Sequence, residues 1–353
     1  MRNPYQAKPP SAFWKSGVVS QNPYRIDAIY KKKFDISGKT RIAAAGSCFA
    51  QHISRHLKKH GYSVLDVEKA PPGLPENSHK RFGFSTYSAR YGNIYTTRQL
   101  LQLAREVSGK FSPEHFIWEK DGKFYDAFRP AVEPDGLDSP EEVSIHRRHH
   151  IKMVEKLFKE MDLFIFTLGL TELWMHEPTK TIYPTAPGTI AGVFSDEDYV
   201  FQNESYGQVL GAFNDFQTEL NEIRDGRPFN VILTVSPVPL TATASDNHVL
   251  VATNYSKAVL RAVAGQLSTD NDHIDYFPSY DIVTNPRLHS TAFEENLRSV
   301  RAETVEYVMK HFFSEHPAIE APAVVSASQS KADELLKDED IQCEEELLEA
   351  FGK

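Results

Sequence analysis

The feature that most constrains the fold is a short apolar run, residues 41–46, which ends at Gly46-Ser47-Cys48. The segment that follows, residues 49–59, places apolar side chains four residues apart, at Phe49, Ile53 and Leu57. A short apolar run is typical of a buried strand, and apolar residues spaced four apart are typical of a helix. The sequence therefore predicts a strand that turns sharply into a helix. We call residues 46–48 the elbow.

The same alternation recurs along the chain. Four further apolar runs predict strands, at residues 63–67, 163–168, 230–235 and 273–277. Helical periodicity predicts helices at residues 150–161, 208–223, 248–267 and 293–313. Strands that alternate with helices are typical of a parallel sheet whose crossover helices cover both of its faces. We therefore predict a three-layer α/β/α sandwich around a mostly parallel, five-stranded sheet.

Three regions lie outside this alternation. Residues 1–35 are rich in Pro, Tyr and Lys and predict an arm that wraps a domain spanning residues 36–316. Residues 69–148 show little clean periodicity, so we expect an insertion that shapes one rim of the sheet. Residues 317–353 predict a linker and an acidic tail, which carries −6 of the net charge of −9. Such a tail is either a solvated segment or a docking element for a partner.

Composition narrows the class of protein further. The chain has two cysteines, one at the elbow and one in the tail, which does not suggest a disulfide framework. The first residues lack the apolar core of a secretory signal, and no apolar run has the length of a membrane span. We therefore expect a cytoplasmic protein. The negative net charge argues against a general nucleic-acid binder. No metal-ligand set or nucleotide-binding loop predicts a cofactor.

Chemistry is expected at the elbow because open α/β sheets bind ligands at the carboxyl ends of their strands. A helix N-terminus behind Cys48 would favour its thiolate and offer amides to an oxyanion. Cys48 is therefore a candidate nucleophile, although many free cysteines are simply small buried residues. Ser47 is either an alternative nucleophile or the N-cap of the helix.

Two other loops bring polar residues to the same edge of the predicted sheet. One is Gly169-Leu170-Thr171-Glu172, and the other begins at Ser236. We expect Gly169, Thr171 and Ser236 to line the site. Glu172 lies in an otherwise apolar segment, where burial would raise its pKa and suit it to acid–base work. The alternative for Glu172 is an ion pair with an arginine such as Arg298.

The string Gly46-Ser47-Cys48-Phe49-Ala50 names the GSCFA domain family, which the chain resembles over residues 40–313. Further blocks in that family's order are residues 91–95, 167–174, 184–188, 234–238 and 276–280. GSCFA domains are grouped with the SGNH (GDSL-like) hydrolases, which include esterases and carbohydrate acetyltransferases and deacetylases. The resemblance implies a flavodoxin-like fold and an acyl-ester hydrolase or acyltransferase. Its substrate would be a small molecule or a glycan.

The resemblance also implies roles for individual residues. Cys48 stands at the position of the SGNH nucleophilic serine, and Gly92, followed by Asn93, corresponds to the glycine of the oxyanion hole. Gly169 begins the block that reads Gly-x-Asn-Asp in SGNH enzymes. Thr171 takes the place of its asparagine, and a hydroxyl can still donate one hydrogen bond.

The general base is the part of this pattern that the sequence lacks. SGNH enzymes carry Asp-x-x-His at the position of residues 296–299, which contain neither residue type. A thiolate needs a base less than a serine does, and three histidines are alternatives beside a fourth, His176, which follows the Gly169–Glu172 block. His52 lies four residues beyond Cys48 on the same helix face, His248 precedes a helix, and His289 follows the last strand. Of the last two we favour His248.

Two functions are therefore open at this point. One is acyl transfer with Cys48 as the nucleophile. The other is a non-catalytic module that kept the fold, lost the base and binds a glycan or another small ligand.

Overall fold

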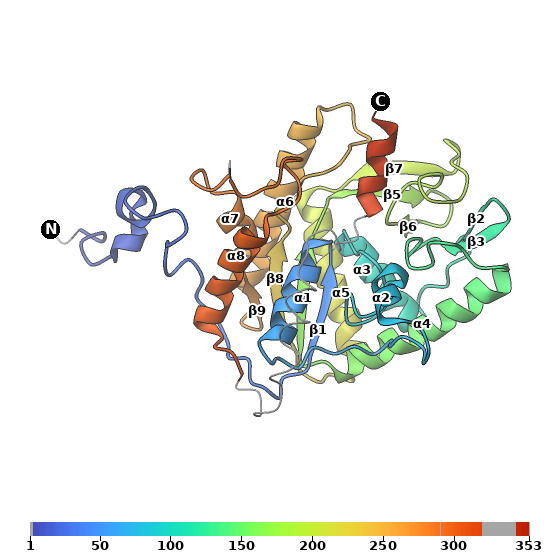
Figure 1. Cartoon of the computed structure of the whole chain (residues 1–353), viewed down its shortest axis with the longest axis horizontal. Helices are drawn as coiled ribbons and strands as arrows, with labels where there is room; N and C mark the ends of the chain where they lie inside the picture. The colour runs from blue at the N-terminus through green and yellow to red at the C-terminus, as the bar shows by residue number, and fades with distance from the viewer. Residues whose placement is uncertain (1–2, 290, 320–343, 353) are drawn as a thin grey trace.

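The computed structural model describes residues 3–289, 291–319 and 344–352 of the chain. Its centre is a parallel sheet in the order β1-β4-β8-β9 (Figure 1). The strands are β1 (Ile42–Gly46), β4 (Leu163–Leu168), β8 (Asn230–Val235) and β9 (Ile274–Tyr276). This confirms the prediction of a parallel α/β fold and the approximate positions of four of its strands.

The fifth predicted strand, residues 63–67, is not formed as such. Its contribution to the sheet is a single parallel bridge between Val64 and Ile42. The backbone leaves the sheet directly afterwards, because the amide of Val67 donates to the carbonyl of Ser88 instead of continuing along β1. The sheet therefore has four strands rather than five, and this segment is its incomplete edge.

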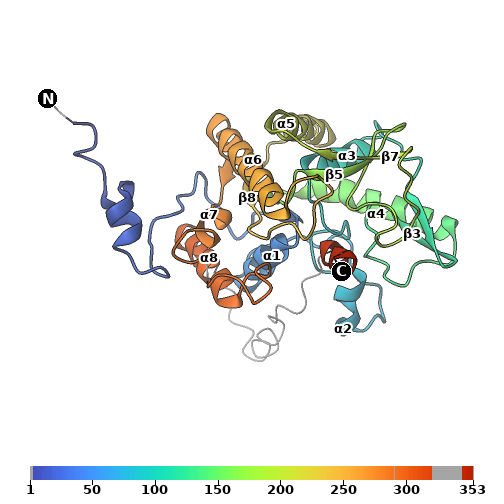
Figure 2. The same ribbon diagram turned by 90° about the horizontal axis from the view of Figure 1, so that it is seen from above.

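Helices cover both faces of the sheet, as expected for a three-layer sandwich (Figure 2). One face packs against α3 (Thr97–Val107), α4 (Pro140–Glu160), α5 (Tyr206–Ile223) and α6 (Val249–Asp270). The other packs against α1 (Phe49–Lys59), α7 (Ser279–Val283) and α8 (Ala302–Glu315). Side chains of β4 alternate between these two cores, since successive residues of a strand point to opposite faces.

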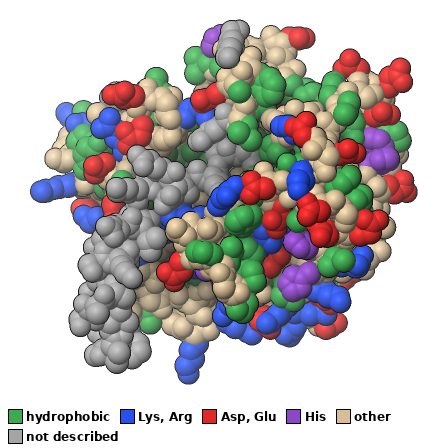
Figure 3. Space-filling view, turned by 45° about the vertical axis from the view of Figure 1, so that its right-hand side comes forward, with side chains coloured by type: hydrophobic (Ala, Val, Ile, Leu, Met, Phe, Trp, Pro, Cys, Tyr) green, Lys and Arg blue, Asp and Glu red, His purple; other side chains and the backbone are tan. Residues whose placement is uncertain are grey.

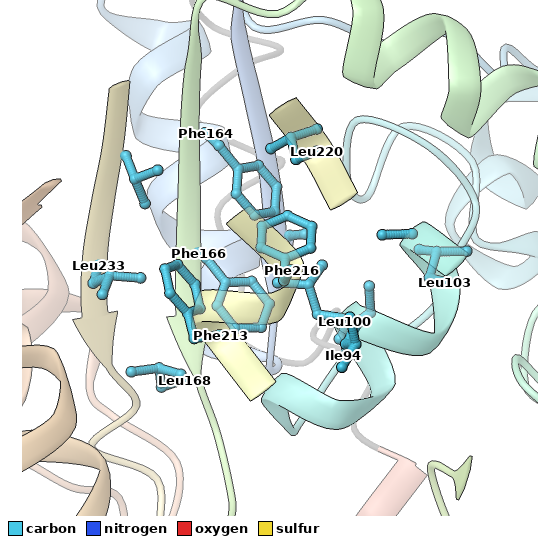
Figure 4. Close-up of a cluster of buried hydrophobic side chains, with 14 of the residues drawn as sticks. Ile94, Leu100, Leu103, Phe164, Phe166, Leu168, Phe213, Phe216, Leu220 and Leu233 are labelled. Atoms are coloured by element: carbon cyan, nitrogen blue, oxygen red, sulfur yellow. The ribbon is translucent and has the colours of Figure 1, made fainter. Parts of the chain in front are cut away.

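The core between β4 and α5 is aromatic. Phe164 and Phe166 of β4 face Phe213 and Phe216 of α5 (Figure 4), and all four are buried. The ring centroids of Phe164 and Phe216 are 5.8 Å apart. Burying each such side chain contributes about 1.5–3 kcal/mol. This packing fixes β4, whose carboxyl end carries one loop of the candidate site.

A small antiparallel sheet that the sequence did not predict follows β4. It consists of β5 (Glu172–His176), flanked by β6 (Thr181–Tyr183) and β7 (Tyr199–Asn203). We call it the small sheet. The strand β5 begins at Glu172, so the chain after β4 enters this sheet before it reaches the crossover helix α5.

The region predicted as an insertion has secondary structure of its own. It contains α2 (Glu76–His79), α3, the start of α4, and a hairpin of β2 (Ile117–Lys120) and β3 (Lys123–Asp126). Helix α3 packs into the main core through Leu100 and Leu103 (Figure 4). The region is therefore part of the body of the domain as well as of its rim.

A buried ionic network joins this region to α4. Arg129 contacts Asp126 at 2.7 Å and Glu68 at 3.4 Å. Arg147 pairs with Asp126 at 3.4 Å and also with Glu106. All five of these side chains are less than 10% exposed. We refer to them as the buried ionic network.

The N-terminal region packs on the body of the domain only in part. Tyr30 donates its hydroxyl proton to Asp275 at 2.8 Å, and the amide of Ile26 donates to the Tyr307 hydroxyl at 3.2 Å. The preceding residues, with the short turns η1 (Pro10–Ala12) and η2 (Lys15–Val19), project from the domain in Figures 1 and 2.

The C-terminal region differs from the sequence prediction at one helix. The helix expected at residues 293–313 begins only at Ala302, because the preceding residues form a loop closed by a bridge between Phe293 and Val300. The predicted linker and acidic tail lie largely outside the described residues. The final described segment is a 3₁₀ helix, η5 (Glu344–Phe351).

Two observations concern the surface and possible surroundings. Among the described residues, no helix has both the length and the apolarity that a bilayer crossing requires. On the face shown in Figure 3, acidic and basic side chains are interspersed. That face is unlike the single-sign basic stripe that marks many nucleic-acid-binding surfaces.

Candidate functional site

The elbow joins β1 to α1 through a turn that requires glycine. Gly46 has φ +132°, and a Cβ atom there would lie 2.4 Å from the carbonyl oxygen of Thr167. The next amide, that of Ser47, donates to the same oxygen at 3.1 Å. Only glycine combines this φ with so close an approach to β4. The role of Gly46 is therefore to shape the turn.

Ser47 and Cys48 are both buried, with 2% and 5% of their surfaces exposed. Cys48 occupies the N-cap position of α1, and its side chain caps nothing. The predicted alternative of Ser47 as the N-cap is therefore wrong. Its hydroxyl has no hydrogen-bond partner among the described residues.

The backbone at the elbow also has unused donors. Within the described part of the chain, the amides of Cys48 and Phe49 donate no hydrogen bond, whereas those of Ala50 and Gln51 donate to Ser47 and Cys48 carbonyls. Free amides at the start of a helix carry partial positive charge. Chemically, the elbow can hold a negatively charged oxygen beside a buried thiol.

Backbone hydrogen bonds hold two other loops against the elbow. The amide of Ile94 donates to the carbonyl of Gly46 at 2.9 Å. The amides of Gly169 and Leu170 both donate to the carbonyl of Tyr95 at 3.0 Å. A Cβ atom on Gly169 would lie 3.0 Å from the Cβ of Ser47. Gly169 therefore allows the loop after β4 to pack directly on the elbow.

Gly92 and Asn93 belong to one of these loops. Gly92 adopts φ +67°, and Asn93 is buried. The hydroxyl of Tyr87 lies within hydrogen-bonding distance of Asn93 Oδ1 and, at 3.2 Å, of the Ser47 carbonyl. Tyr87 thus links this loop to the elbow. Sequence reasoning missed it, since a tyrosine in a region without periodicity gives no signal of its tertiary partners.

Thr171 belongs to the loop after β4, and its hydroxyl already forms a hydrogen bond. Its Oγ1 donates to Asn203 Oδ1 at 2.6 Å, and its amide donates to Ser256 Oγ at 3.0 Å. A hydroxyl has a single proton to donate. Thr171 could therefore serve an oxyanion only if its bond to Asn203 opened.

Glu172 begins β5 and is partly buried. Its Oε1 accepts a hydrogen bond from Thr243 Oγ1 at 2.7 Å, and burial raises the pKa of its carboxyl group. Among the described residues it forms no ion pair with Arg298, the alternative that the sequence suggested. The guanidinium of Arg298 instead contacts Glu349 Oε1 at 3.5 Å.

The three candidate histidines have different surroundings. Burial lowers the pKa of His52 to about 3, so its ring is neutral near pH 7 and a weak base. His248 is exposed, and its Nδ1 accepts from the amide of Leu250 at the start of α6. His289 is also exposed. Within the described part of the chain, no histidine forms a hydrogen bond with Cys48 Sγ.

Lys257 is a polar residue of this region that sequence reasoning missed. Only 2% of its surface is exposed, and its Nζ donates to the carbonyl of Gly169 at 2.7 Å. A buried ammonium group therefore lies against the loop that packs on the elbow. Helical spacing could have predicted its burial. Lys257 precedes Leu260 by three residues and Ala264 by seven, so it lies on the apolar face of α6.

Ser236 begins the loop after β8. Its amide donates to the carbonyl of Leu168 at 2.9 Å, and its Oγ accepts from the amide of Val238 at 3.3 Å. The loop continues to Leu240 and residues 242–244, which line a pocket of about 480 Å³. That volume lies in the range of small-molecule sites, about 300–1,000 Å³. The pocket also reaches Leu170 and Glu172.

Among the described residues, no group of three or more His, Cys, Asp or Glu side chains is placed to hold a metal ion. His150, from a histidine-rich stretch of the sequence, is buried with its Nδ1 2.7 Å from Glu68.

Comparison with known proteins gives one match. The model of the GSCFA family matches residues 41–312. This range begins one residue before β1 and ends within α8, so it includes the elbow, the loops packed on it and Lys257. No curated protein and no solved structure matches the chain.

Proposed function

The chain belongs to the GSCFA family, and we propose that its elbow is the centre of an acyl-transfer site with Cys48 as the nucleophile. We take the family to be related to SGNH-like hydrolases. The reaction would then be hydrolysis or transfer of an ester-linked acyl group. The observation that supports it best is a set of hydrogen-bond donors around a buried thiol that have no partner among the described residues. These are the amides of Cys48 and Phe49 and the hydroxyl of Ser47.

The proposed first step is attack of the Cys48 thiolate on the ester carbonyl carbon. A carbon–sulfur bond forms, the bond to the alcohol oxygen breaks, and the leaving alkoxide takes up the proton that the thiol lost. The carbonyl oxygen becomes negative in the tetrahedral intermediate, where the free amides of Cys48 and Phe49 stabilise it. In the second step, water or a sugar hydroxyl attacks the thioester carbon, and its proton returns to the sulfur as the acyl group leaves.

Positive potential at the elbow would stabilise the oxyanion. The N-terminus of α1 supplies partial charge, worth typically 0.3–1 kcal/mol and up to about 2 kcal/mol where partly buried. The Nζ of Lys257 donates to the Gly169 carbonyl at 2.7 Å and holds this loop against α6. We assign Lys257 a positioning role, because it acts on the elbow through the loop of Gly169.

We assign proton transfer to Glu172. Burial raises the pKa of its carboxyl group, which favours the protonated acid that could give its proton to a leaving alkoxide. His52 is less suited to the role because burial holds its pKa at about 3. His248, the histidine favoured on sequence grounds, and His289 are exposed and make no hydrogen bond with the elbow within the described residues.

A panel of aryl esters and acetylated sugars tests the proposal. We expect the wild-type protein to turn over at least one ester, and the Cys48→Ala variant to lose that turnover by several orders of magnitude. The matched control is Cys343→Ala, which removes the other cysteine and should leave the rate unchanged. Loss of turnover in Ser47→Ala but not in Cys48→Ala would move the nucleophile to Ser47, and full activity in both variants would refute the proposal.

A second candidate is a non-catalytic module that binds a glycan or another small ligand. It is favoured by the observation that, within the described chain, no histidine is hydrogen-bonded to Cys48. Calorimetric titration with acetylated and free oligosaccharides distinguishes the two candidates. Binding without turnover, unchanged in Cys48→Ser, would support the module, whereas turnover that depends on Cys48 excludes it.

A further inference from the structure

The pocket beside Glu172 has an apolar lining. Trp174 packs edge-on against Phe194, with ring centroids 5.2 Å apart, and lies 5.7 Å from Phe201. Leu170 and Leu240 line it as well and belong to one buried cluster. An aromatic and aliphatic lining of this kind favours a ligand that is itself apolar.

Two polar side chains of the pocket do not need a ligand as their hydrogen-bond partner. Glu172 and Thr243 are hydrogen-bonded to one another at 2.7 Å, so each already has a partner. A sugar, which needs several donors and acceptors in return for its lost hydration, would find few of them here. A hydrocarbon chain would not leave these two side chains unpaired.

The pocket begins next to the elbow. Leu170 lines it, and the preceding residue, Gly169, packs against Ser47. A carbonyl group held at the elbow could therefore extend its substituent along this loop into the pocket. The apolar lining suits the hydrocarbon part of such an ester, which we take to be its acyl chain.

Part of the pocket wall comes from the C-terminal segment η5, drawn in red at the end of the chain in Figure 1, which lines the pocket together with residues of β5. Leu348 and Phe351 line the pocket, yet Phe351 is 68% exposed and Leu347 is 49% exposed. The ion pair of η5 with Arg298 involves Glu349, whose side chain is 61% exposed. A pair of this kind contributes only about 0–1 kcal/mol. The described contacts thus tie this wall to the domain through an exposed ion pair, whereas backbone hydrogen bonds join the strands of the small sheet opposite.

We infer that this pocket binds the apolar acyl chain of the substrate and that η5 is its movable outer wall. The assignment of the chain as an acyl group rests on the proposed function, but the binding of an apolar chain does not.

The binding experiment uses neutral alcohols as probes and the full-length Cys48→Ala protein, so that its outcome does not depend on catalysis. We expect 1-octanol to bind more tightly than 1-butanol in calorimetric titrations, by about fourfold in Kd for each added methylene group that is buried. Equal affinity for the two alcohols, or tighter binding of methyl glucoside than of octanol, would overturn the inference.

A substitution that fills the pocket locates the binding. Ala242 lines the pocket and is exposed, so Ala242→Trp should fold normally and weaken octanol binding at least tenfold. Ala302→Trp places the same side chain at an exposed position on α8 and is the matched control. Thermal unfolding of both variants verifies their folding. Unchanged octanol affinity in a folded Ala242→Trp variant would refute the location.

Hydrogen exchange tests the movable wall. In the full chain, amides of residues 344–352 should exchange several-fold more slowly when octanol is bound, and Leu348→Asp should abolish that protection. Exchange that octanol leaves unchanged would refute the role of η5. Esterase activity without octanol binding would refute the pocket but leave the proposed function intact, and octanol binding without esterase activity would do the reverse.

Discussion

The elbow and the buried ionic network are both polar and both buried, but they differ in how their polar groups are satisfied. In the network, Arg129 and Arg147 each contact two carboxylates, so every charge has an opposite charge beside it. At the elbow, the hydroxyl of Ser47 has no partner among the described residues, and two amides donate no hydrogen bond.

This difference separates a structural role from a functional one. A buried polar group without a partner costs free energy, and a protein that keeps several of them together has a reason to do so. The mutually paired charges of the network hold the fold, whereas unpaired donors remain available to a ligand or a transition state. We therefore predict that substitutions in the network reduce stability and that substitutions at the elbow mainly reduce activity.

The largest effect on stability is expected in the network. Arg147→Met leaves Asp126 and Glu106 with less compensation in a buried setting, which should cost about 3–5 kcal/mol of unfolding free energy. Urea denaturation measures this cost. Arg81→Met is the matched control, because Arg81 pairs with Asp135 on the surface and should contribute less than about 1 kcal/mol. Similar losses of unfolding free energy in both variants would contradict the structural role of the buried ionic network.

A pH-dependent effect is expected from Glu204, whose amide donates to the Thr171 carbonyl. Its carboxyl group is fully buried, neither oxygen accepts a hydrogen bond from a described residue, and burial raises its pKa from 4.5 to about 7. Because the folded state holds this proton more tightly, the stabilisation is fully present below pH 4.5 and is lost as the pH rises through about 7.

The shift in the pKa of Glu204 corresponds to a loss of about 3 kcal/mol between acidic and alkaline pH. Glu204→Gln should remove this part of the pH dependence, as urea denaturation at pH 5 and pH 9 would reveal. An unchanged pH profile in the variant would show that Glu204 is ionised at no cost in the folded protein.

The smallest effect comes from a matched pair of serines near β1. Ser88 Oγ accepts from the buried amide of Ala44 at 2.9 Å, so Ser88→Ala should cost about 1–3 kcal/mol. Ser47→Ala removes a hydroxyl that no described residue pairs with and should change stability by less than about 0.5 kcal/mol. Both side chains are at most 2% exposed. A cost for Ser47 equal to that for Ser88 would mean that its hydroxyl is satisfied in the folded protein.

Local sequence patterns predicted the elements that depend on local periodicity. Patterns among neighbouring residues predicted the turn at Gly46, the apolar face of α1 and the apolar strands β4 and β8. The small sheet could not be predicted in the same way. Its strands span three to five residues, and their pairing depends on contacts across a loop of 15 residues between Tyr183 and Tyr199.

Features that depend on tertiary contacts were also beyond the sequence. Residues 63–67 have the composition of a strand, but the bond between Val67 and Ser88 draws the backbone away from β1. The burial of Lys257 against Gly169 follows from how α6 docks on the sheet. A sequence pattern placed the candidate nucleophile at the elbow, while the satisfied or unsatisfied state of the groups around it required the structure.

The most direct test of the central claim is to trap an acyl group on the elbow. The protein would be mixed with p-nitrophenyl butyrate, quenched with acid within the first turnover, and digested for peptide mass spectrometry. We predict one butyryl group per chain, attached to Cys48 and absent from the Cys48→Ala variant. A burst of p-nitrophenol with the acyl group on another residue, or turnover without any acylated peptide, would contradict the account.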